Sequence, residues 1–394
     1  MSPRLRIGLF GLLGSGNLGN DGSLEAVLRF LRAEHPDAEL SALCGGPDLV
    51  SARYGITTKA LHWYGGEYRT ASGVRAIAFK ALGKLVDVFR TYSWVRRQDV
   101  VIVPGMGVLE ATLPLRPWGF PYSLFLLCAA GRLTGTKVAL VSVGANVISD
   151  RATRTLVRWS ARMASYRSYR DMISRDAMTA MGVDTSGDEV YPDLAFALPT
   201  PAAAPSEGAV GVGVMAFRGG NEERDRAAEI YRSYVDGMKA FVGRLVELGR
   251  PVRLFHGDQV DTPVLDEIIA EYGEERVSAA SLSSLDNLMQ EMGHVDTVVA
   301  TRFHNVLCAL KVCRPTLSVG YAEKNEVLMA EMGLGAFCHP ARAVDPDRLF
   351  AQFTELERRS AELRETLAER NAANTQRLKH QFAALSATFP GGRR

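Results

Sequence analysis

The sequence predicts an α/β protein of two doubly wound domains that face a cleft, each built on a parallel sheet, followed by a charged C-terminal helix. Short apolar, β-branched runs alternate with helical stretches along most of the chain, which is typical of parallel sheets with crossover helices. The chain has 394 residues. That length exceeds the ~250 to 300 residues beyond which a single core stops growing. A proline- and alanine-rich stretch without periodicity, residues 198–208, indicates a linker.

We therefore expect an N-terminal domain at residues 1–198, a linker at 199–208, a second domain at 209–340, and a C-terminal helix and tail at 341–394. The strands expected in the first domain are residues 6–13, 39–44, 100–104, 137–143 and 165–169. Its expected helices are residues 23–34, 122–133, 153–164 and 174–181.

In the second domain we expect strands at residues 209–215 and 252–256, and helices at 227–248 and 264–272. A βαβ unit at residues 298–324 closes this domain. The highly charged residues 345–385 have helical periodicity and predict a surface or terminal helix.

Composition excludes several classes of function. The chain has 46 basic and 44 acidic residues, and this balance argues against broad nucleic-acid binding. The five cysteines are scattered without C-x-x-C spacing, so we expect reduced, buried thiols and no zinc site: Cys44, Cys128, Cys308, Cys313 and Cys338. The apolar N-terminal stretch is interrupted at once by GSGN, too short for a signal peptide, so we expect a cytoplasmic protein. The sequence leaves open whether it forms a homo-oligomer.

The first candidate site is the glycine-rich turn at residues 11–22, after the first expected strand. Gly16 allows the backbone to approach a ligand closely, and Asn17, Asn20 and Asp21 exceed what helix capping requires. The turn does not match the dinucleotide fingerprint, and no acidic residue ends the second strand, so a nicotinamide cofactor is disfavoured. The alternative is a tight turn that only lets the helix pack on the sheet.

The second candidate is the loop at residues 104–112, directly after a strand. Gly105 and Gly107 give the backbone freedom at the carboxyl end of the sheet. Glu110 is suited to act as a general base on a hydroxyl. The alternative for Glu110 is a solvated side chain.

The third candidate is Arg170, where a strand ends and a helix begins. A guanidinium at this point is placed to bind a carboxylate or phosphate through two parallel hydrogen bonds. The alternative is a salt bridge to Asp171 or to another carboxylate. Asp171 or Ser174 can cap the following helix, and we expect Arg167 and Arg175 on the surface.

The fourth candidate is the βαβ unit at residues 298–324, which carries Arg302, His304 and Lys324. Open α/β sheets bind ligands beyond the carboxyl ends of their strands, where helix N-termini favour anions. In a regular helix, Arg302 and His304 lie about 200° apart. They therefore converge on one ligand only if Arg302 precedes the helix in extended conformation. The expected buried stripe of the helix is Phe303, Val306, Leu307 and Leu310.

These motifs resemble the polysaccharide pyruvyl transferase family. The landmarks are G-N-x-G at residues 16–19, the PGMG loop at 104–107, R-D-x-x-S at 170–174 followed by YPDLAF at 191–196, and R-F-H at 302–304 with G-Y-x-x-K at 320–324. They occur in the order of the family. The resemblance implies a fold similar to the two-domain GT-B glycosyltransferases, with Rossmann-like domains, and transfer of the enolpyruvyl unit of phosphoenolpyruvate onto sugar hydroxyls as a ketal.

By that resemblance, Arg170, Arg302 and His304 fall at donor-binding positions. The chain departs from the family pattern at two places on the acceptor side. The first turn reads GNLGND, so either Asp21 is displaced by one position or Asn20 serves instead. The second loop has Met106 and Glu110 where relatives usually carry more glycine.

Phosphoenolpyruvate carries a phosphate and a carboxylate, which suits the cations Arg170, Arg302 and Lys324. His304 as an imidazolium is either the acid that protonates the vinylic carbon or a stabiliser of the departing phosphate. Asp21 or Glu110 is suited to orient a second sugar hydroxyl, and Gly16, Asn17, Asn20, Gly105 and Gly107 are expected on the acceptor side. We expect no metal and no cofactor, because metal-ligand spacing is absent.

Three other functions stay open from the sequence. They are a GT-B glycosyltransferase that uses a nucleotide sugar, a non-catalytic glycan-binding relative, and a nucleotide-sugar epimerase-like enzyme. The acidic residue missing after the second strand disfavours the last. The expected acceptor is a glycan, often lipid- or nucleotide-linked, or a glycolipid.

Residues 74–97 bear on where the protein works. They combine six basic residues and one acidic residue with apolar positions at helical spacing. This pattern is typical of a helix that lies on an anionic membrane and predicts peripheral attachment. The alternative is a basic helix that lines a cleft for an anionic acceptor or faces solvent.

Overall fold

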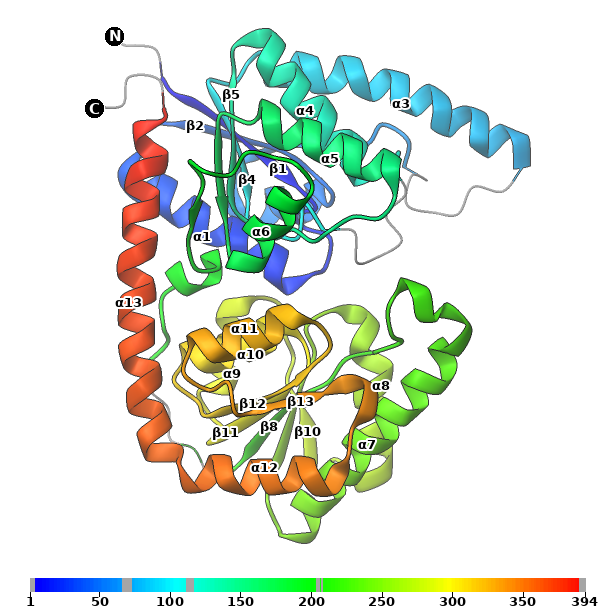
Figure 1. Ribbon diagram of the computed structural model, residues 1–394, viewed down its shortest axis with the longest axis vertical. Helices are drawn as coiled ribbons and strands as arrows, with labels where there is room; N and C mark the ends of the chain where they lie inside the picture. Colours follow the sequence, from blue (N-terminus) through cyan, green and yellow to red (C-terminus); the bar gives the residue numbers. More distant parts are fainter. Residues whose placement is uncertain (1–3, 66–72, 111–116, 203–205, 207, 390–394) are drawn as a thin grey trace. The chain divides into compact units, whose positions relative to one another are not determined.

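The computed structural model describes residues 4–65, 73–110, 117–202, 206 and 208–389 (Figure 1). The chain divides into two compact units. The first consists of Met1–Ser15, Ser23–Leu194 and Arg377–Arg394, and the second of Gly16–Gly22 and Ala195–Gln376. The short segment Gly16–Gly22 therefore packs with the second unit although it lies near the N-terminus. Residues 111–112 of the expected second loop, residues 203–205 and 207 of the linker, and residues 390–394 of the tail lie outside the described residues.

Within the described ranges, the first unit holds a seven-stranded sheet in the order β3-β2-β1-β4-β5-β6-β7. Its strands all run parallel: β1 Arg6–Gly11, β2 Glu39–Cys44, β3 Thr57–Ala60, β4 Val100–Pro104, β5 Lys137–Val143, β6 Tyr166–Tyr169 and β7 Glu189–Val190. The strand order reverses between β1 and β4, so the loops after these two strands start at the topological switch point, where doubly wound sheets bind ligands.

The helices of the first unit connect these strands. They are α1 Leu18–Glu34, α2 Pro47–Tyr54, α3 Gly73–Val95, α4 Phe120–Thr134, α5 Arg151–Met163 and α6 Met172–Ala180. The first turn of α1 belongs to the second unit, and the 3-10 helix η1 Leu194–Ala197 stands where the chain passes into that unit. Helix α1 begins at Leu18, five residues before the expected start, and so includes the second half of the glycine-rich turn. The glycines in its first turn have low helix propensity, which hid this start from the sequence pattern.

Within the described ranges, the second unit holds a six-stranded parallel sheet in the order β10-β9-β8-β11-β12-β13. Its strands are β8 Val210–Gly213, β9 Val252–Phe255, β10 Val277–Ala279, β11 Thr297–Ala300, β12 Thr316–Gly320 and β13 Cys338–Pro340. The order reverses between β8 and β11. Arg302 follows β11 by two residues, so it stands at the switch point of this sheet. The βαβ unit around Arg302 does not close the sheet, because β13 pairs with β12 beyond it.

The helices of the second unit are α7 Ala227–Glu247, α8 Thr262–Tyr272, α9 Leu285–Met292, α10 Phe303–Lys311, α11 Glu323–Glu331 and α12 Pro346–Arg358. Three 3-10 helices accompany them: η2 Asn221–Arg226, η3 Gln259–Asp261 and η4 Ala341–Ala343. The four residues of the expected α10 stripe are all buried, but the helix is buried on nearly all sides rather than along one stripe, because Asn305, Cys308, Ala309 and Lys311 are buried as well. Strands β4 and β11, at the centres of the two sheets, are buried along their whole length, since helices cover both faces of such sheets.

The C-terminal region contains two helices where the sequence predicts one. Helix α12 ends at Arg358 and α13 Ser360–Ala387 follows, with Arg359 outside helical geometry between them. The last part of α13 belongs to the first unit. There the buried Gln381 donates hydrogen bonds to Ser142 Oγ at 2.8 Å and Ser168 Oγ at 2.9 Å. This helix is therefore more than a surface helix, because it carries a buried polar anchor.

None of the helices in the described part of the chain combines the length and the apolar character that a membrane crossing requires. All five cysteines are free thiols, and Cys44, Cys128 and Cys308 are buried as expected. Cys313 and Cys338 are half-buried.

Candidate functional site

The N-terminus of α10 presents Arg302 as its N-cap residue. The backbone of Arg302 is extended, with φ −65° and ψ 134°, and no side chain caps the helix. This is the conformation that the sequence analysis requires if Arg302 and His304 are to approach one ligand. An uncapped helix start directs backbone N–H groups outward and favours a negatively charged ligand.

A buried carboxylate fixes the guanidinium of Arg302. Arg302 Nε and Nη2 donate to the two oxygens of Asp261 at 2.8 and 2.6 Å. Asp261 is fully buried and also accepts hydrogen bonds from the backbone N–H groups of Ala216 at 2.9 Å and Gly257 at 3.4 Å. Burial opposes the charge on Arg302, but the hydrogen bonds and charge of Asp261 outweigh it and raise the guanidinium pKa above its ordinary value. Arg302 is thus a permanent, oriented cation.

His304 lies in the first turn of α10, with its ring against the backbone of Gly19. An ideal Cβ on Gly19 would stand 2.0 Å from His304 Nδ1 and 2.1 Å from Cε1. A side chain at position 19 would therefore require the ring of His304 to move. The G-N-x-G element, expected on the acceptor side, therefore packs in the second unit against the histidine expected on the donor side.

Asn17 organises the segment Gly16–Gly22. Its Oδ1 accepts hydrogen bonds from the backbone N–H groups of Gly19 at 3.1 Å and Asn20 at 3.2 Å, so Asn17 caps α1. Its Nδ2 donates to Asp258 Oδ2 at 3.3 Å, and the two residues also form an isolated β-bridge. Asp21 is buried in the first turn of α1, and Asn20 is half-buried. Gly16 has φ +89°, which favours glycine, and lies near Gln259.

Lys324 lies in the first turn of α11, close to the start of α10. Its Nζ stands 5.7 Å from the centroid of the Phe303 ring and 5.6 Å from that of Tyr321. The N-cap residue of α11, Ala322, has no side-chain capping bond. The structure thus brings the predicted residues Arg302, His304 and Lys324 to neighbouring helix starts at the carboxyl ends of β11 and β12.

Asn305 is a residue of this region that the sequence analysis missed. It is fully buried in α10, and among the described residues neither amide atom has a hydrogen-bond partner. The amide packs against two glycines that leave it room. A Cβ on Gly213 would stand 2.8 Å from Asn305 Nδ2, and a Cβ on Gly257 would stand 3.1 Å from Asn305 Oδ1. A buried amide without partners costs about 1–3 kcal/mol, so the amide of Asn305 calls for a partner from outside the chain, such as an ordered water or a bound ligand.

Arg170 directly follows β6 and belongs to the first unit. Its guanidinium is buried among three carboxylates: Nη2 bonds Glu110 Oε1, Nε lies 3.5 Å from Asp171 Oδ2, and Nη1 lies 3.7 Å from Asp193 Oδ2. This is the salt-bridged arrangement that the sequence left open as the alternative. Asp171 also caps α6 by accepting from the backbone N–H of Ser174 at 2.7 Å, as expected.

The loop after β4 has unusual backbone geometry. Gly105 and Met106 both adopt left-handed conformations, with φ +54° and +63°, and for methionine this is strained. Gly107 and Gly144 leave room for the carboxylate of Glu110. A Cβ on Gly107 would stand 2.7 Å from Glu110 Oε2, and a Cβ on Gly144 would stand 2.4 Å from Glu110 Oε1. The glycines thus hold Glu110 in a tight space beside Arg170.

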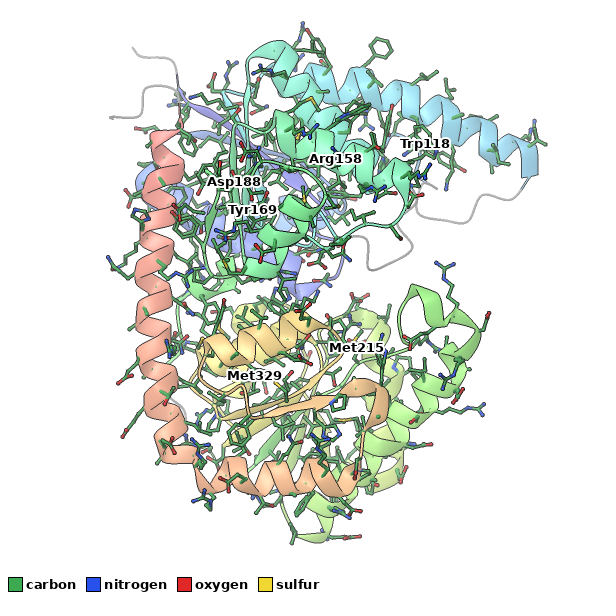
Figure 2. All side chains as sticks on the ribbon, in the orientation of Figure 1. Trp118, Arg158, Tyr169, Asp188, Met215 and Met329 are labelled. Atoms are coloured by element: carbon green, nitrogen blue, oxygen red, sulfur yellow. The ribbon has the colours of Figure 1, made fainter. Side chains whose placement is uncertain are left out.

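Arg167 is not the surface residue that the sequence predicts. Its Nε and Nη2 donate to Asp188 at 2.8 and 3.0 Å, and the hydroxyl of the fully buried Tyr169 donates to Asp188 Oδ2 at 3.2 Å. Figure 2 shows Tyr169 and Asp188 next to each other. Burial and the charge of Asp188 raise the pKa of Tyr169 well above its ordinary value, so its hydroxyl stays protonated at neutral pH and can donate to Asp188.

The family model for polysaccharide pyruvyl transferases matches residues 17–323. The chain belongs to the polysaccharide pyruvyl transferase family. The matched range begins at Asn17 and includes Arg170, Arg302 and His304, whereas Lys324 lies one residue beyond it. No curated protein matches the chain in sequence.

Solved structures share the fold of this family member at low sequence identity. A putative UDP-N-acetylglucosamine 2-epimerase from Listeria monocytogenes has a TM-score of 0.64 at 12% identity, covering 98% of this chain and 96% of its own. MurG from Acinetobacter baumannii has a TM-score of 0.54 at 14% identity, covering 97% and 99%. The two parallel α/β units therefore form a GT-B-like fold, as predicted.

The structure divides the predicted site residues into two groups. Arg302, His304, Lys324, Gly16, Asn17, Asn20 and Asp21 belong to the second unit, whereas Arg170, Glu110, Gly105 and Gly107 belong to the first. Asp258 and Asp261 were missed although they follow β9 at a carboxyl strand end, the rule that identified Arg302. Asp193 was missed because only the tertiary structure brings it to Arg170.

Proposed function

We propose that the protein transfers the enolpyruvyl unit of phosphoenolpyruvate onto two hydroxyls of a sugar in a glycan or glycolipid, forming a ketal and releasing phosphate. The observation that carries the proposal is the cationic N-terminus of α10, where Arg302 is an extended N-cap held by Asp261. Family membership supports the same reaction.

The donor would bind at Arg302, His304 and Lys324. A guanidinium has five N–H groups, and Asp261 takes two of those on Arg302. Among the described residues nothing bonds Nη1, so three N–H groups are available to a carboxylate or phosphate. The uncapped start of α11 and the ammonium of Lys324 add further positive potential nearby.

A proton adds to the methylene carbon of phosphoenolpyruvate, and a sugar hydroxyl attacks the neighbouring carbon and loses its proton. Phosphate then leaves with its bonding electron pair, and a second hydroxyl closes the ketal and gives up its proton. His304 is suited either to supply the first proton or to bind the departing phosphate.

The carboxylates around Arg170 fit a role with the acceptor better than with the donor. Among the described residues, three carboxylates face the guanidinium of Arg170. Such a group repels a phosphate but accepts hydrogen bonds from sugar hydroxyls, and Glu110 is suited to take up a hydroxyl proton. We accordingly assign donor binding to Arg302 and Lys324, and assign Arg170 to positioning Glu110.

Isothermal titration of phosphoenolpyruvate into the purified protein tests the donor. Arg302→Lys keeps the charge but loses the fork, and Lys324→Ala removes the ammonium. We expect each to weaken binding about ten- to hundredfold, the value of one charge-assisted hydrogen bond. Arg226→Ala serves as the control, since Arg226 is an arginine that pairs with Glu229 on the surface. Circular dichroism verifies the fold of each variant.

A reaction in D2O separates the two roles of His304. If His304 is the acid, His304→Gln lowers kcat and the rate at which deuterium enters the new methyl group, with little change in KM. If His304 binds the phosphate, the main effect of His304→Gln is a higher KM for phosphoenolpyruvate. An absence of heat with phosphoenolpyruvate, together with saturable binding of a nucleotide sugar, would instead establish a GT-B glycosyltransferase. Intact glycan binding and cellular function in Arg302 and His304 variants would indicate a non-catalytic relative.

A further inference from the structure

Helix α3 of the first unit exposes its apolar face. Val74 and Phe89 have 84% and 75% of their surface exposed, and Leu82, Leu85 and Tyr92 are also exposed. At about 100° per residue, these five positions fall within roughly 80° of the helix circumference. They form one continuous apolar stripe, which we call the α3 stripe.

The opposite face of α3 is buried, and it combines polar residues with the apolar Trp94 and Val95. Gly83, Asp87 and Thr91 are buried on that face. The carboxylate of Asp87 accepts hydrogen bonds from the backbone N–H of Trp63 at 2.8 Å and from Arg90 at 3.2 Å, and it lies 3.2 Å from His62 Nδ1. These bonds fix the rotation of the helix with the α3 stripe outward.

Exposed aromatic residues accompany the stripe. The side chain of Trp63 is exposed, and its backbone N–H donates to Asp87 of α3. Trp118, labelled in Figure 2, is exposed and its ring lies 5.8 Å from that of Tyr122. Tyr122 in turn donates to the carbonyl of Lys84 on α3 at 3.4 Å. Tryptophan and tyrosine favour the boundary between water and lipid, where one end of the side chain is apolar and the other wet.

The charges of α3 are complementary to an anionic surface. Residues 74–97 contain six basic residues and one acidic residue, which gives a net charge of 6 − 1 = +5. The single acid is the buried Asp87, whose charge is compensated inside the fold. Arg75 in the first turn and Arg96 and Arg97 just beyond the last turn are exposed.

We propose that the α3 stripe docks the protein onto a bilayer surface that contains anionic phospholipid. The five apolar side chains insert at the boundary of head groups and acyl chains, and the arginines at both ends bind lipid phosphates. A second copy of this chain is disfavoured as the occupant, because pairing two such helices brings like charges together without an exposed acid on either. The inference goes beyond the proposed reaction and does not depend on it.

Co-sedimentation with vesicles tests the inference on the full chain. One vesicle type contains equal parts phosphatidylcholine and phosphatidylglycerol, and the other phosphatidylcholine alone. We expect the protein to pellet with the mixed vesicles and to be released at about 1 M salt, where the screening length falls to about 3 Å. We expect little binding to phosphatidylcholine alone.

Two variants separate the apolar and charged contributions. Leu85→Ser with Phe89→Ser disrupts the α3 stripe, and Arg75→Glu with Arg96→Glu reverses two charges. We expect each pair to reduce the affinity for mixed vesicles by about tenfold or more. Leu248→Ser, which changes an exposed leucine in the second unit, is the control and should bind like the parent. Because all these positions are exposed, the variants should keep the circular dichroism spectrum of the parent.

Three outcomes would overturn the proposal. One is an absence of pelleting with mixed vesicles. Another is equal pelleting with both vesicle types, or pelleting that the serine variants retain. The third is a dimer in sedimentation velocity that Phe89→Ser dissociates in a protein that does not bind vesicles, which would identify a second copy as the occupant.

Discussion

The ring of His304 lies against the backbone of Gly19, so closely that a Cβ on residue 19 would stand 2.0 Å from Nδ1. These residues are 285 positions apart, and Asn17 holds the glycine in place through hydrogen bonds to the first turn of α1. A residue that carries no functional group of its own thereby sets the position of the histidine expected to act on the donor.

We predict that Gly19→Ala displaces the imidazole of His304 and lowers kcat/KM about a hundredfold, the usual consequence of a misplacement near 1 Å. Helix propensity would favour alanine in the first turn of α1, so the thermal midpoint should change little. Phosphate release reports the activity and thermal unfolding the stability.

Gly45→Ala is the matched control for Gly19→Ala. The atom nearest to the new Cβ would be Leu12 Cα at 3.6 Å, which is an ordinary contact. We expect it to retain the activity of the parent. Full activity in Gly19→Ala would show that the position of His304 tolerates change.

The strands that the sequence predicts and those it misses differ in their place in the sheets. The interior strands of both described sheets are all predicted, and coverage on both faces gives most of them apolar runs, with YRSY of β6 as an exception. The missed strands are the sheet edges β3, β7, β10 and β13. Edge strands are short and half-exposed, as in TTKA of β3, and so carry no such run.

The candidate site was predictable where one strand end determines it. Arg302 and His304 follow β11 directly, and the rule for carboxyl strand ends identifies them. The packing of Gly19 on His304 could not be predicted, because no local pattern indicates which distant segment contacts a glycine. The three carboxylates around Arg170 likewise come from separate segments.

We predict that Asn305→Ala weakens binding of phosphoenolpyruvate about tenfold while the free energy of unfolding falls little or rises. The substitution creates a small cavity but also removes a buried amide without partners, which costs about 1–3 kcal/mol in the native state. Titration calorimetry and chemical denaturation measure the two effects.

Val306→Ala on the same helix is the comparison for Asn305→Ala, because we expect it to reduce stability without affecting ligand binding. Val306 is fully buried among apolar groups. Its truncation should cost about 2 kcal/mol of stability and leave ligand binding intact. If Asn305→Ala were as destabilising as Val306→Ala and bound the donor normally, a functional role for the amide would be excluded.

We predict that the protein loses the stabilisation contributed by ionised Asp87 in acid. Burial opposes its ionisation, but hydrogen bonds from His62 and the Trp63 backbone, with the charge of Arg90, outweigh burial and hold its pKa below the ordinary value. A group whose pKa is lower in the folded state stabilises the fold above its unfolded pKa of about 3.9 and loses that contribution as pH falls through the folded value.

The difference in unfolding free energy between the parent and Asp87→Asn should therefore be constant near neutral pH and shrink below about pH 4. Denaturation at a series of pH values measures it. Asp48→Asn, at an exposed position in the first turn of α2, provides the comparison. A difference that stays the same down to pH 2 would contradict the assigned cause.

Cys128 should resist alkylation in the native protein. It is fully buried in α4, and burial raises the pKa of its thiol to about 12, so almost no thiolate forms near pH 8. Iodoacetamide followed by peptide mass spectrometry should label Cys128 only after denaturation, whereas the half-buried Cys313 should react earlier. Rapid native labelling of Cys128 would mean that α4 opens readily.

Glu110→Gln tests the carboxylates of the first unit. The substitution preserves the shape of the side chain, and Arg170 keeps Asp171 and Asp193 as partners, so the fold should persist. If Glu110 takes up a hydroxyl proton, kcat should fall about a hundredfold or more while the dissociation constant of phosphoenolpyruvate stays the same, because donor binding is assigned to Arg302 and Lys324.

Arg170→Lys distinguishes positioning from direct donor binding in the same assay. A lysine retains one positive charge but cannot bridge three carboxylates at once. We expect kcat to fall with an unchanged dissociation constant for phosphoenolpyruvate, as for Glu110→Gln. A higher dissociation constant for phosphoenolpyruvate with normal kcat would instead assign Arg170 to donor binding, as the sequence resemblance implies.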